Sequence, residues 1–313
     1  MPTIKKYRLR FKKQSFVILI ALITGSLTLS SFAAEQTSAP LTPSLTESFR
    51  ADLMTGSAVV EVPIIVPPGR NNLQPDLKLS YSSNSPNGIY GVGWRLELGS
   101  IQRQTKQGVP KYDETDTFVA NLSGATIELV SIGNGEYRAK QEGAFFKFSF
   151  NGVSWQVKDK SGATYSFGST DNSRQGLLGR VFRWDLDRIT DLRENYMTIN
   201  YFQDQGQIYP LAIQYTGKQG GELPAHTIDF IYESRNDTFS DYRSNFEVKT
   251  TKRLSAIDVN ANGERARKYE LGYFYSPHTA CSLLTTVTQY SSDGVTALPP
   301  LVFEYQSGSV IGN

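Results

Sequence analysis

Alternation of apolar and polar residues with period two is the feature that most constrains how this chain can fold. In residues 57–66 and 76–81 every second residue is apolar, as with Leu77, Leu79 and Tyr81. A segment of this kind forms a strand with one face on a core and the other in water. No stretch beyond residue 34 has the spacing of an amphipathic helix, so the sequence predicts an all-β fold.

Glycine and asparagine mark the turns between the expected strands. About four short strands are expected between Thr126 and Phe167, separated by hairpin signals. These signals are Gly133-Asn134-Gly135, Asn151-Gly152 and Ser161-Gly162. Three glycines within residues 88–93, next to Trp94, predict a further turn, because glycine adopts backbone angles that other residues resist.

Aromatic residues are abundant, and many expected strands end on tyrosine. The chain contains 17 Tyr and 17 Phe but only 3 Met, and aromatic side chains fit a pleated, half-buried surface. The segments that end on tyrosine are 197–201, 211–215, 227–232, 269–273 and 301–305. Their spacing is too irregular for a strict repeat. They predict an antiparallel meander of many short hairpin-connected strands.

The N-terminus has the order of a secretory signal peptide. Basic residues up to Lys13 precede an apolar run, Phe16–Leu29, and small residues follow at Ser31 and Ala33. The run is shorter than the roughly 20 residues that span a bilayer, and an uncleaved anchor is the alternative. We predict a signal peptide over residues 1–33 and secretion by the Sec pathway, with the periplasm or cell surface as other destinations. No membrane contact is expected after cleavage.

Two segments follow the expected signal peptide. Residues 34–48 are rich in Ser, Thr and Pro, which predicts a flexible linker that cannot form a core. Residues 49–313 carry the strand pattern and are expected to form the β domain, which is long enough to bury a substantial core.

The charge balance excludes a nucleic-acid-binding surface. Six of the 32 Lys and Arg residues lie within the first thirteen positions, so the chain without them has 26 cations against 30 acidic residues. Binding of nucleic acid depends on clustered cations that neutralise phosphates. The net acidic body therefore indicates that nucleic acid is not a partner.

Residue types that commonly perform chemistry are sparse. His226 and His278 are the only histidines, and no ligand spacing for a metal surrounds them. Neither a Gly-x-Ser-x-Gly elbow nor a phosphate-binding loop occurs. We therefore expect no catalytic residue, no metal and no cofactor. The single cysteine, Cys281, is expected to be buried, with an intermolecular disulfide as the alternative.

Two groups of carboxylates are the best candidates for a site, because glycosidases use paired acids. The groups are Asp113, Glu114 and Asp116, and Asp185, Asp187 and Asp191. The first follows a turn-like stretch and lacks the spaced frame of a calcium loop. The second alternates along an expected strand with Arg183 and Arg188, which predicts solvated cross-strand ion pairs. Both groups are interpreted as structural, with catalysis or, for the first group, calcium binding as alternatives.

Long, turn-rich segments carry a more specific signal. They are Thr55–Arg70, Leu73–Asn84, Asn87–Leu96 and Ile101–Asp113, followed by Asp187–Tyr201, Phe246–Leu254 and Ala297–Tyr305. These segments resemble the N-terminal domain of the Salmonella virulence-plasmid 65 kDa B protein (SpvB) family. That domain also opens the B components of insecticidal toxin complexes and many secreted Rhs/YD-repeat proteins. One departure is Glu194, where the family usually has Gly, so a left-handed turn residue is expected at Asn195.

The resemblance implies a structural role. In such proteins this region precedes β-propeller and Rhs-repeat segments and helps to build a β shell around a toxic cargo. The ADP-ribosyltransferase of the namesake lies in a separate C-terminal domain, and its Ser-Thr-Ser and Glu-x-Glu motifs do not occur in this sequence. We expect a secreted, non-catalytic structural or export module of a toxin-type or Rhs-type surface protein. Its expected partners are the rest of such an assembly or a second copy.

Two other classes of function remain open from the residues. An adhesion or glycan-binding domain would use exposed aromatic faces, for which Trp94, Trp155 and Trp184 are the candidates. Large aromatic residues are more often found in a core. An enzyme would need carboxylates with raised pKa values in a pocket, for instance at Asp113 and Asp116.

The signal-peptide interpretation predicts where the exported protein begins. Cleavage after Ala33, or after Ala34, gives a mature N-terminus at Ala34 or Glu35, because the small residues at Ser31 and Ala33 fit the cleavage rule. N-terminal sequencing of periplasmic or culture protein measures this directly. An exported form that still carries Met1 would show that the segment is not removed.

Overall fold

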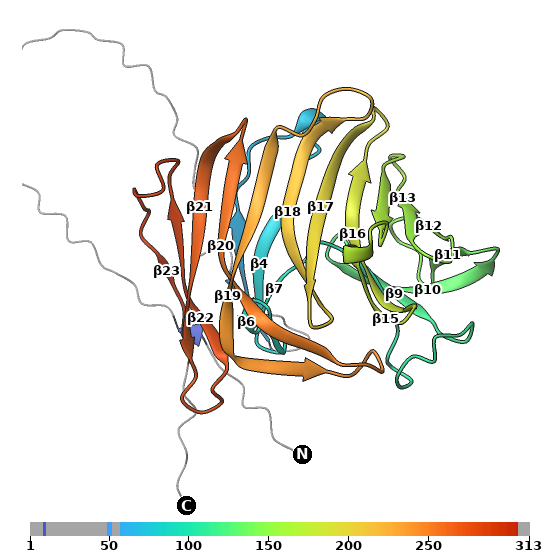
Figure 1. Ribbon diagram of the computed structural model, residues 1–313, viewed down its shortest axis with the longest axis horizontal. Coiled ribbons are helices and arrows are strands. Elements are labelled where there is room, and N and C mark those ends of the chain that lie inside the picture. Colours follow the sequence, from blue (N-terminus) through green and yellow to red (C-terminus); the bar gives the residue numbers. More distant parts are fainter. Residues whose placement is uncertain (1–8, 11–48, 52–56, 306–313) are drawn as a thin grey trace, which may run out of the picture.

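The computed structural model describes residues 9–10, 49–51 and 57–305, and strands make up nearly all of their regular structure (Figure 1). Two 3-10 turns, η2 (Arg70–Asn72) and η3 (Asp171–Ser173), are the only helical elements in this part of the chain. The all-β prediction is confirmed. The expected signal peptide, apart from residues 9–10, and the whole expected linker lie outside the described residues.

The described strands are, in chain order, β1 (Leu9–Arg10), β2 (Phe49–Ala51), β3 (Ala58–Ile64), β4 (Leu77–Ser82), β5 (Asn87–Gly88), β6 (Gly91–Val92), β7 (Trp94–Leu96), β8 (Ser100–Arg103), β9 (Phe118–Leu122), β10 (Ala125–Gly133), β11 (Glu136–Ala139), β12 (Lys147–Phe150), β13 (Trp155–Lys158), β14 (Thr164–Phe167), β15 (Arg174–Leu177), β16 (Arg180–Thr190), β17 (Asn195–Asp204), β18 (Gln207–Lys218), β19 (His226–Asp241), β20 (Val248–Ala261), β21 (Glu264–Tyr275), β22 (Ser282–Tyr290), β23 (Leu301–Val302) and β24 (Glu304–Tyr305).

One antiparallel sheet of sixteen strands forms most of the molecule. Strands β16 to β23 follow one another across it as a meander, as Figure 1 shows. At the other end, β8 to β14 are joined in succession, and β14 also pairs with β16. These strands and β16 therefore close into a ring, so the predicted meander is confirmed and its first part is closed on itself.

Strand β16 is the point where the ring and the rest of the sheet divide. Its first half pairs with β15 and β8, and its second half pairs with β14 and β17. Between the β8 and β17 pairings, Leu186 uses other partners. Its N–H donates to the carbonyl of Gly99 at 3.0 Å, and its carbonyl accepts a hydrogen bond from the Tyr201 hydroxyl at 2.6 Å. We call this place the fork.

A smaller sheet, ordered β2-β3-β4-β7, lies against one face of the long sheet (Figure 1). Its alternating residues Val60 and Leu79 are buried in the same core as Ile213 and Ile228 of β18 and β19. This is the face that the period-two pattern predicts. Two tyrosines from the long sheet also reach the segment after β3. Tyr215 donates to the Pro67 carbonyl at 2.9 Å, and the hydroxyl of Tyr269 accepts the Ile65 N–H at 3.0 Å.

The expected hairpin turns are confirmed, with one correction. Asn134 adopts a left-handed conformation, and so do the glycines of all three hairpin signals. In the turn before β17, however, the left-handed residue is Glu194, with φ at 65°, and Asn195 begins the strand. Asn195 is held in the strand because its N–H and side-chain amide both bind the Asp191 carboxylate.

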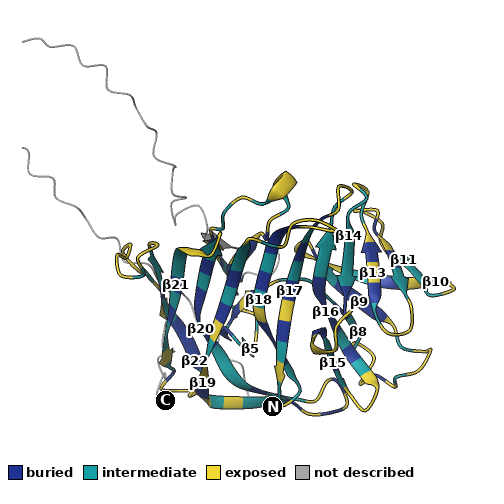
Figure 2. Ribbon diagram, turned by 45° about the horizontal axis from the view of Figure 1, so that its top comes forward, coloured by how far each residue is buried: buried dark blue, intermediate teal, exposed yellow. Residues whose placement is uncertain are grey.

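The strands of the second half are longer than predicted, and four of the five tyrosines expected at strand ends lie inside them. Strands β17 to β22 have between 9 and 16 residues, and Tyr201, Tyr232 and Tyr273 lie inside them. Each of these tyrosines is next to a register shift in its ladder. Their hydroxyls donate to main-chain carbonyls of neighbouring strands at 2.6 to 2.8 Å. The tyrosines therefore support the irregular places of long strands. In Figure 2 buried and intermediate segments follow one another along these strands, and exposed residues gather in the turns.

A buried ion pair stabilises the bend of β19, where the register with β20 shifts between Ser234 and Phe239. The Arg235 side chain has no exposed surface and binds Asp237 at 2.5 Å. Its guanidinium also donates to the Gly88 carbonyl at 2.7 Å. Asp237 in turn accepts the Ser282 N–H at 2.6 Å and its hydroxyl at 2.7 Å. The pair thus joins β19 to β5 and β22.

This pair predicts a loss of stability in acid. Burial alone would raise the pKa of Asp237, but hydrogen bonds from Arg235 and Ser282 outweigh burial and lower it. A lowered pKa in the folded state stabilises the fold above the unfolded value of about 3.9, and this contribution is lost as the pH falls below it. Asp237→Asn should lower the free energy of unfolding at pH 7 by about 3 kcal/mol, because Arg235 stays buried without its counter-charge.

Urea denaturation between pH 7 and pH 2 measures both effects. The difference between wild type and Asp237→Asn should shrink as the pH falls below about 4, because Asp237 then takes up its proton in the unfolded chain while it stays ionised in the folded one. Asp76→Asn is the matched control, because its side chain is 86% exposed and its contact with Lys78 is long at 3.8 Å. Equal behaviour of the two variants would contradict the role assigned to Asp237.

Candidate functional site

The first carboxylate group anchors a loop. Asp113 and Glu114 are exposed, and hydrogen bonds from Thr115 lower the pKa of Asp113. Asp116 binds Arg103 of β8 at 2.8 Å and accepts the N–H groups of Lys111 and Tyr112. The loop is thus fastened to the ring by Asp116, and its carboxylates do not share a pocket.

The same arginine holds the loop in a second way. The Arg103 guanidinium lies 5.0 Å from the ring of Tyr112 and 5.2 Å from the ring of Phe118. Tyr112 also stacks on Phe246 and donates its hydroxyl to the Ser244 carbonyl in the β19–β20 hairpin. The residues around Asp116 therefore connect the loop, the ring and this hairpin.

The second carboxylate group is mostly buried, and the prediction of solvated cross-strand ion pairs is wrong. Asp187 accepts hydrogen bonds from the Ser169 and Thr170 N–H groups and the Ser173 hydroxyl at 2.5 to 3.1 Å. Asp185 pairs with Arg183 of its own strand. Both side chains are covered because β14, β15 and the residues before β8 pack around β16, which a strand pattern alone does not reveal.

The other members of the group serve local structure. Asp191 binds the Arg193 and Asn195 N–H groups in the turn before β17. Arg188 has no carboxylate partner among the described residues, and its guanidinium lies 4.2 Å from the centre of the Tyr196 ring. The two acidic groups are therefore not brought together into one site.

The histidines and the cysteine lie apart from one another. His226 packs edge-on against Tyr215 at 5.2 Å, whereas His278 is exposed in the turn before β22. Cys281 is only partly buried, with its Sγ 3.5 Å from the Thr279 carbonyl, so the expectation of full burial is wrong. It lies just before β22, in a turn that no other element covers completely. Within the described ranges, no cluster of three or more His, Cys, Asp or Glu is arranged to hold a metal ion.

The three tryptophans are buried, so none of them presents a face for sugar stacking. Trp155 and Trp184 lie inside the ring of strands, with their ring centroids 6.1 Å apart. Phe118 packs edge-on against Trp155, and Phe150 stacks on Trp155 and packs edge-on against Trp184. Trp94 contacts Phe303 at 4.7 Å and donates its indole N–H to the Tyr305 hydroxyl at 2.8 Å. The route to glycan binding through these residues is therefore contradicted.

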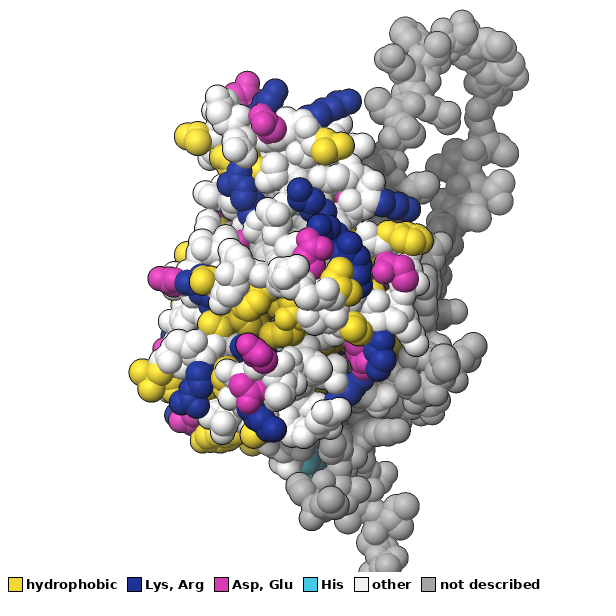
Figure 3. Space-filling model, turned by 90° about the vertical axis from the view of Figure 1, so that its right-hand side faces the viewer, with side chains coloured by type: hydrophobic (Ala, Val, Ile, Leu, Met, Phe, Trp, Pro, Cys, Tyr) yellow, Lys and Arg dark blue, Asp and Glu magenta, His cyan; other side chains and the backbone are white. Residues whose placement is uncertain are grey.

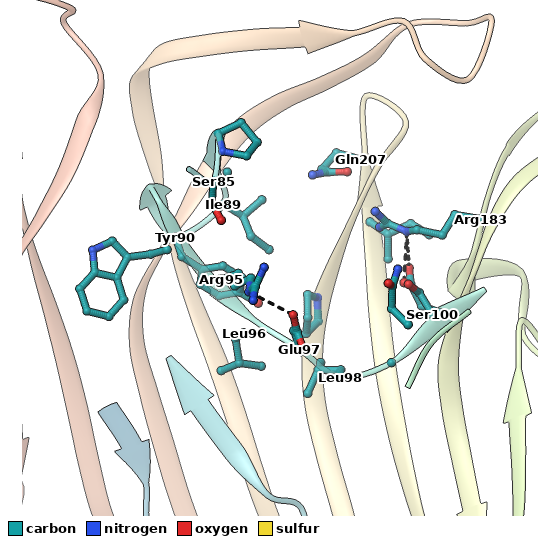
Figure 4. Close-up of a pocket in the computed structure, with 18 of the residues that line it drawn as sticks. Ser85, Ile89, Tyr90, Arg95, Leu96, Glu97, Leu98, Ser100, Arg183 and Gln207 are labelled. Carbon is teal, nitrogen blue, oxygen red and sulfur yellow. Dashed lines mark hydrogen bonds and ion pairs between the residues drawn. The ribbon is translucent and has the colours of Figure 1, made fainter. Parts of the chain in front are cut away.

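A polar cavity of about 450 Å³ lies beside the fork. Its walls come from residues 85–100 on one side and from β16, β17 and β18 on the other. In Figure 4 Tyr90, Arg95 and Glu97 approach the space from the first wall, and Arg183 and Gln207 approach it from the second. Two ion pairs line it, Arg95 with Glu97 at 3.0 Å and Arg183 with Asp185 at 3.1 Å.

Burial raises the pKa values of two residues that line the cavity, Asp185 and Tyr90. Asp185 is 8% exposed, and desolvation raises its pKa although the neighbouring Arg183 opposes the shift. Desolvation also raises the pKa of Tyr90, assisted by the charge of Asp185. The sequence does not single out Tyr90 or Gln207 as site residues: Tyr90 lies in the turn-rich segment Asn87–Leu96 with no signal of chemistry, and only the fold brings Gln207 beside it. The glycines on both sides of Tyr90 predict a turn, but they do not indicate a role for the tyrosine itself.

No helix among the described residues is long and apolar enough to cross a bilayer.

Comparison with known proteins relates the chain to SpvB of Salmonella and to a TcdB2-TccC3-TEV structure. Residues 53–150 match the family described as Salmonella virulence plasmid 65kDa B protein, SpvB. The mono(ADP-ribosyl)transferase SpvB of Salmonella typhimurium (strain 14028s / SGSC 2262) is 27% identical over 38% of this chain, and the match spans only 24% of that relative. The SpvB of Salmonella choleraesuis (strain SC-B67) is equally similar.

Two solved structures share the fold of the described domain. The N-terminal domain of effector protein SpvB from Salmonella typhimurium strain LT2 superposes with a TM-score of 0.63 at 18% identity, over 74% of this chain and 98% of that one. The TcdB2-TccC3-TEV structure has a TM-score of 0.72 at 21% identity, over 88% of this chain and 17% of that one. The resemblance predicted from the sequence is confirmed: residues 53–150 match the model of the Salmonella virulence plasmid 65kDa B protein family, and the described domain shares the fold of the SpvB N-terminal domain.

Proposed function

We propose that this chain is a secreted, non-catalytic structural module of a toxin-type or Rhs-type surface protein, and that it contributes to a β shell. One observation carries the proposal: the fold accounts for 98% of the solved SpvB N-terminal domain. The relatives that are named as transferases are much longer than the matched region, which spans only 24% of their length. The carboxylates chosen from the sequence support the same interpretation, because Asp116, Asp187 and Asp191 bind loops and turns.

The proposed partners are protein chains, either the rest of such an assembly or a second copy. One solved structure that shares this fold, TcdB2-TccC3-TEV, joins TcdB2 with TccC3. In this chain, β10 pairs with β9 only as far as Leu129, so one edge of Val130–Gly133 has no strand partner among the described residues. Val130 and Ile132 are 46% and 56% exposed on this segment. Such an edge is a template for pairing with another strand.

The face at the β10 end of the molecule fits a protein partner better than nucleic acid. Figure 3 shows hydrophobic side chains gathered in the middle of the face, with basic and acidic side chains interspersed around them. Mixed charges around an apolar centre are typical of protein interfaces. A face for nucleic acid would carry clustered cations instead.

The exported protein should therefore associate and show no turnover. We expect no ADP-ribosylation of actin, no hydrolysis of glycans, and a mass above that of one chain in light scattering at micromolar concentration. An actin-modifying transferase and a glycosidase serve as positive controls. Turnover that disappears in Asp116→Asn or Asp185→Asn would overturn the non-catalytic assignment, and a monomer stable for days would overturn the need for a partner.

Asp116 should matter for stability and not for chemistry. Asp116→Ala leaves the nearly buried Arg103 without its counter-charge, which should lower the free energy of unfolding by about 3 kcal/mol in urea denaturation. Asp113→Ala is the control three positions away, because its side chain is exposed and its partner is Thr115. Its denaturation midpoint should match that of the wild type. Equal losses in the two variants would show that Asp116 does not anchor the loop.

A further inference from the structure

The cavity beside the fork is lined by polar groups that keep free hydrogen-bonding capacity. Tyr90 lines the cavity and is 5% exposed, and its hydroxyl has no hydrogen-bond partner within the described part of the chain. Asp185 is 8% exposed and accepts a hydrogen bond only from Nε of Arg183. The terminal nitrogens of Arg183 form no hydrogen bond to described residues. These groups face the cavity without further partners among the described residues, so they are available to hydrogen-bond a polar molecule that enters it.

The charges of the cavity cancel in pairs. Arg183 is matched by Asp185, and Arg95 by Glu97, each two positions apart on the same wall. The cavity therefore attracts neither anions nor cations over a distance. Each pair places donors beside acceptors, which is the arrangement that a hydroxyl needs, because a hydroxyl both donates and accepts.

The rest of the lining has the same character. Ser100, Asn121 and Gln207 add neutral hydroxyl and amide groups, and Leu96 and Ile208 add apolar surface. A volume of about 450 Å³ lies within the roughly 300 to 1,000 Å³ of small-molecule sites, which combine apolar surface with a few placed polar groups.

We propose that this cavity binds a neutral saccharide, with the Arg183–Asp185 pair and the Tyr90 hydroxyl as its main polar contacts. The sugar hydroxyls donate to Asp185 and accept from Arg183 and Tyr90, and the apolar lining contacts the carbon faces of the ring. This site does not depend on exposed tryptophan faces: Trp155 and Trp184 are inside the ring of strands, and Trp94, which belongs to the cavity lining, is only 2% exposed. It also does not depend on the proposed structural role, because a shell module and a free adhesion domain could both carry it.

The sharpest variant is Tyr90→Phe, because it removes a hydroxyl that no described residue binds. The full exported chain is applied to an array of neutral, sialylated and sulfated glycans, and the strongest neutral glycan is then titrated by calorimetry. Tyr90→Phe should keep the melting temperature of the wild type and weaken this binding about five- to tenfold. Arg183→Gln should weaken it further.

Tyr215→Phe is the matched control, because the Tyr215 hydroxyl binds the Pro67 carbonyl at 2.9 Å and is not part of the cavity lining. It should lower the melting temperature and leave the affinity for the glycan unchanged. The proposal is overturned if no neutral glycan binds, which would mean that water alone fills the cavity. Binding restricted to sialylated or sulfated glycans, or equal affinity of Tyr90→Phe and wild type, would overturn it as well.

Discussion

The hydrogen bond from the Tyr201 hydroxyl to the Leu186 carbonyl, at 2.6 Å, occupies the one place on which the architecture depends. A single strand, β16, has to serve both a closed ring and an open meander, and β8 and β17 separate from each other beside it. A strand that changes partners leaves main-chain groups unpaired, and unpaired buried groups are costly. Gly99 supplies an acceptor for the Leu186 N–H, and Tyr201 supplies the donor for its carbonyl. Burial raises the pKa of Tyr201, so the donor keeps its proton.

The same device recurs at two other register shifts of the long sheet. Tyr232 and Tyr273 sit beside register shifts and donate to the carbonyls of Pro210 and Leu254. A register shift strengthens local twist and interrupts the ladder, and a tyrosine from the neighbouring strand can restore the missing hydrogen bond without adding a charge. This explains why the second half of the chain is rich in tyrosine. It also explains why these residues lie inside strands, although the sequence pattern places them at strand ends.

The sequence predicts local features well and spatial relations poorly. The alternation of Val60 and Leu79 correctly identifies the buried face of the small sheet. The glycines of the three hairpin signals correctly identify turns between β10 and β14 in the long sheet. Period two shows which side chains share a face but does not show what covers that face. The strand pattern alone therefore places Asp185 in solvent, whereas in the structure the segment before β8 covers it. The pairing of β14 with β16 and the position of Tyr90 depend on contacts between distant residues, which no local pattern contains.

Pairs of Arg and Asp two positions apart show how far the sequence can predict the role of a charged residue. Arg183 with Asp185, Arg235 with Asp237, and Asp241 with Arg243 are each two positions apart. The first two pairs lie within one strand, where such residues share a face, and the third joins the last residue of β19 to the turn that follows it. That pairing can be read from spacing. The environments differ nevertheless: the second pair is buried and joins three elements, the third is largely exposed, and the first borders a cavity with donors to spare. A pairing rule gives the partner of a charge, but only the packing of the two sheets decides whether the pair stabilises the fold or is free to bind something else.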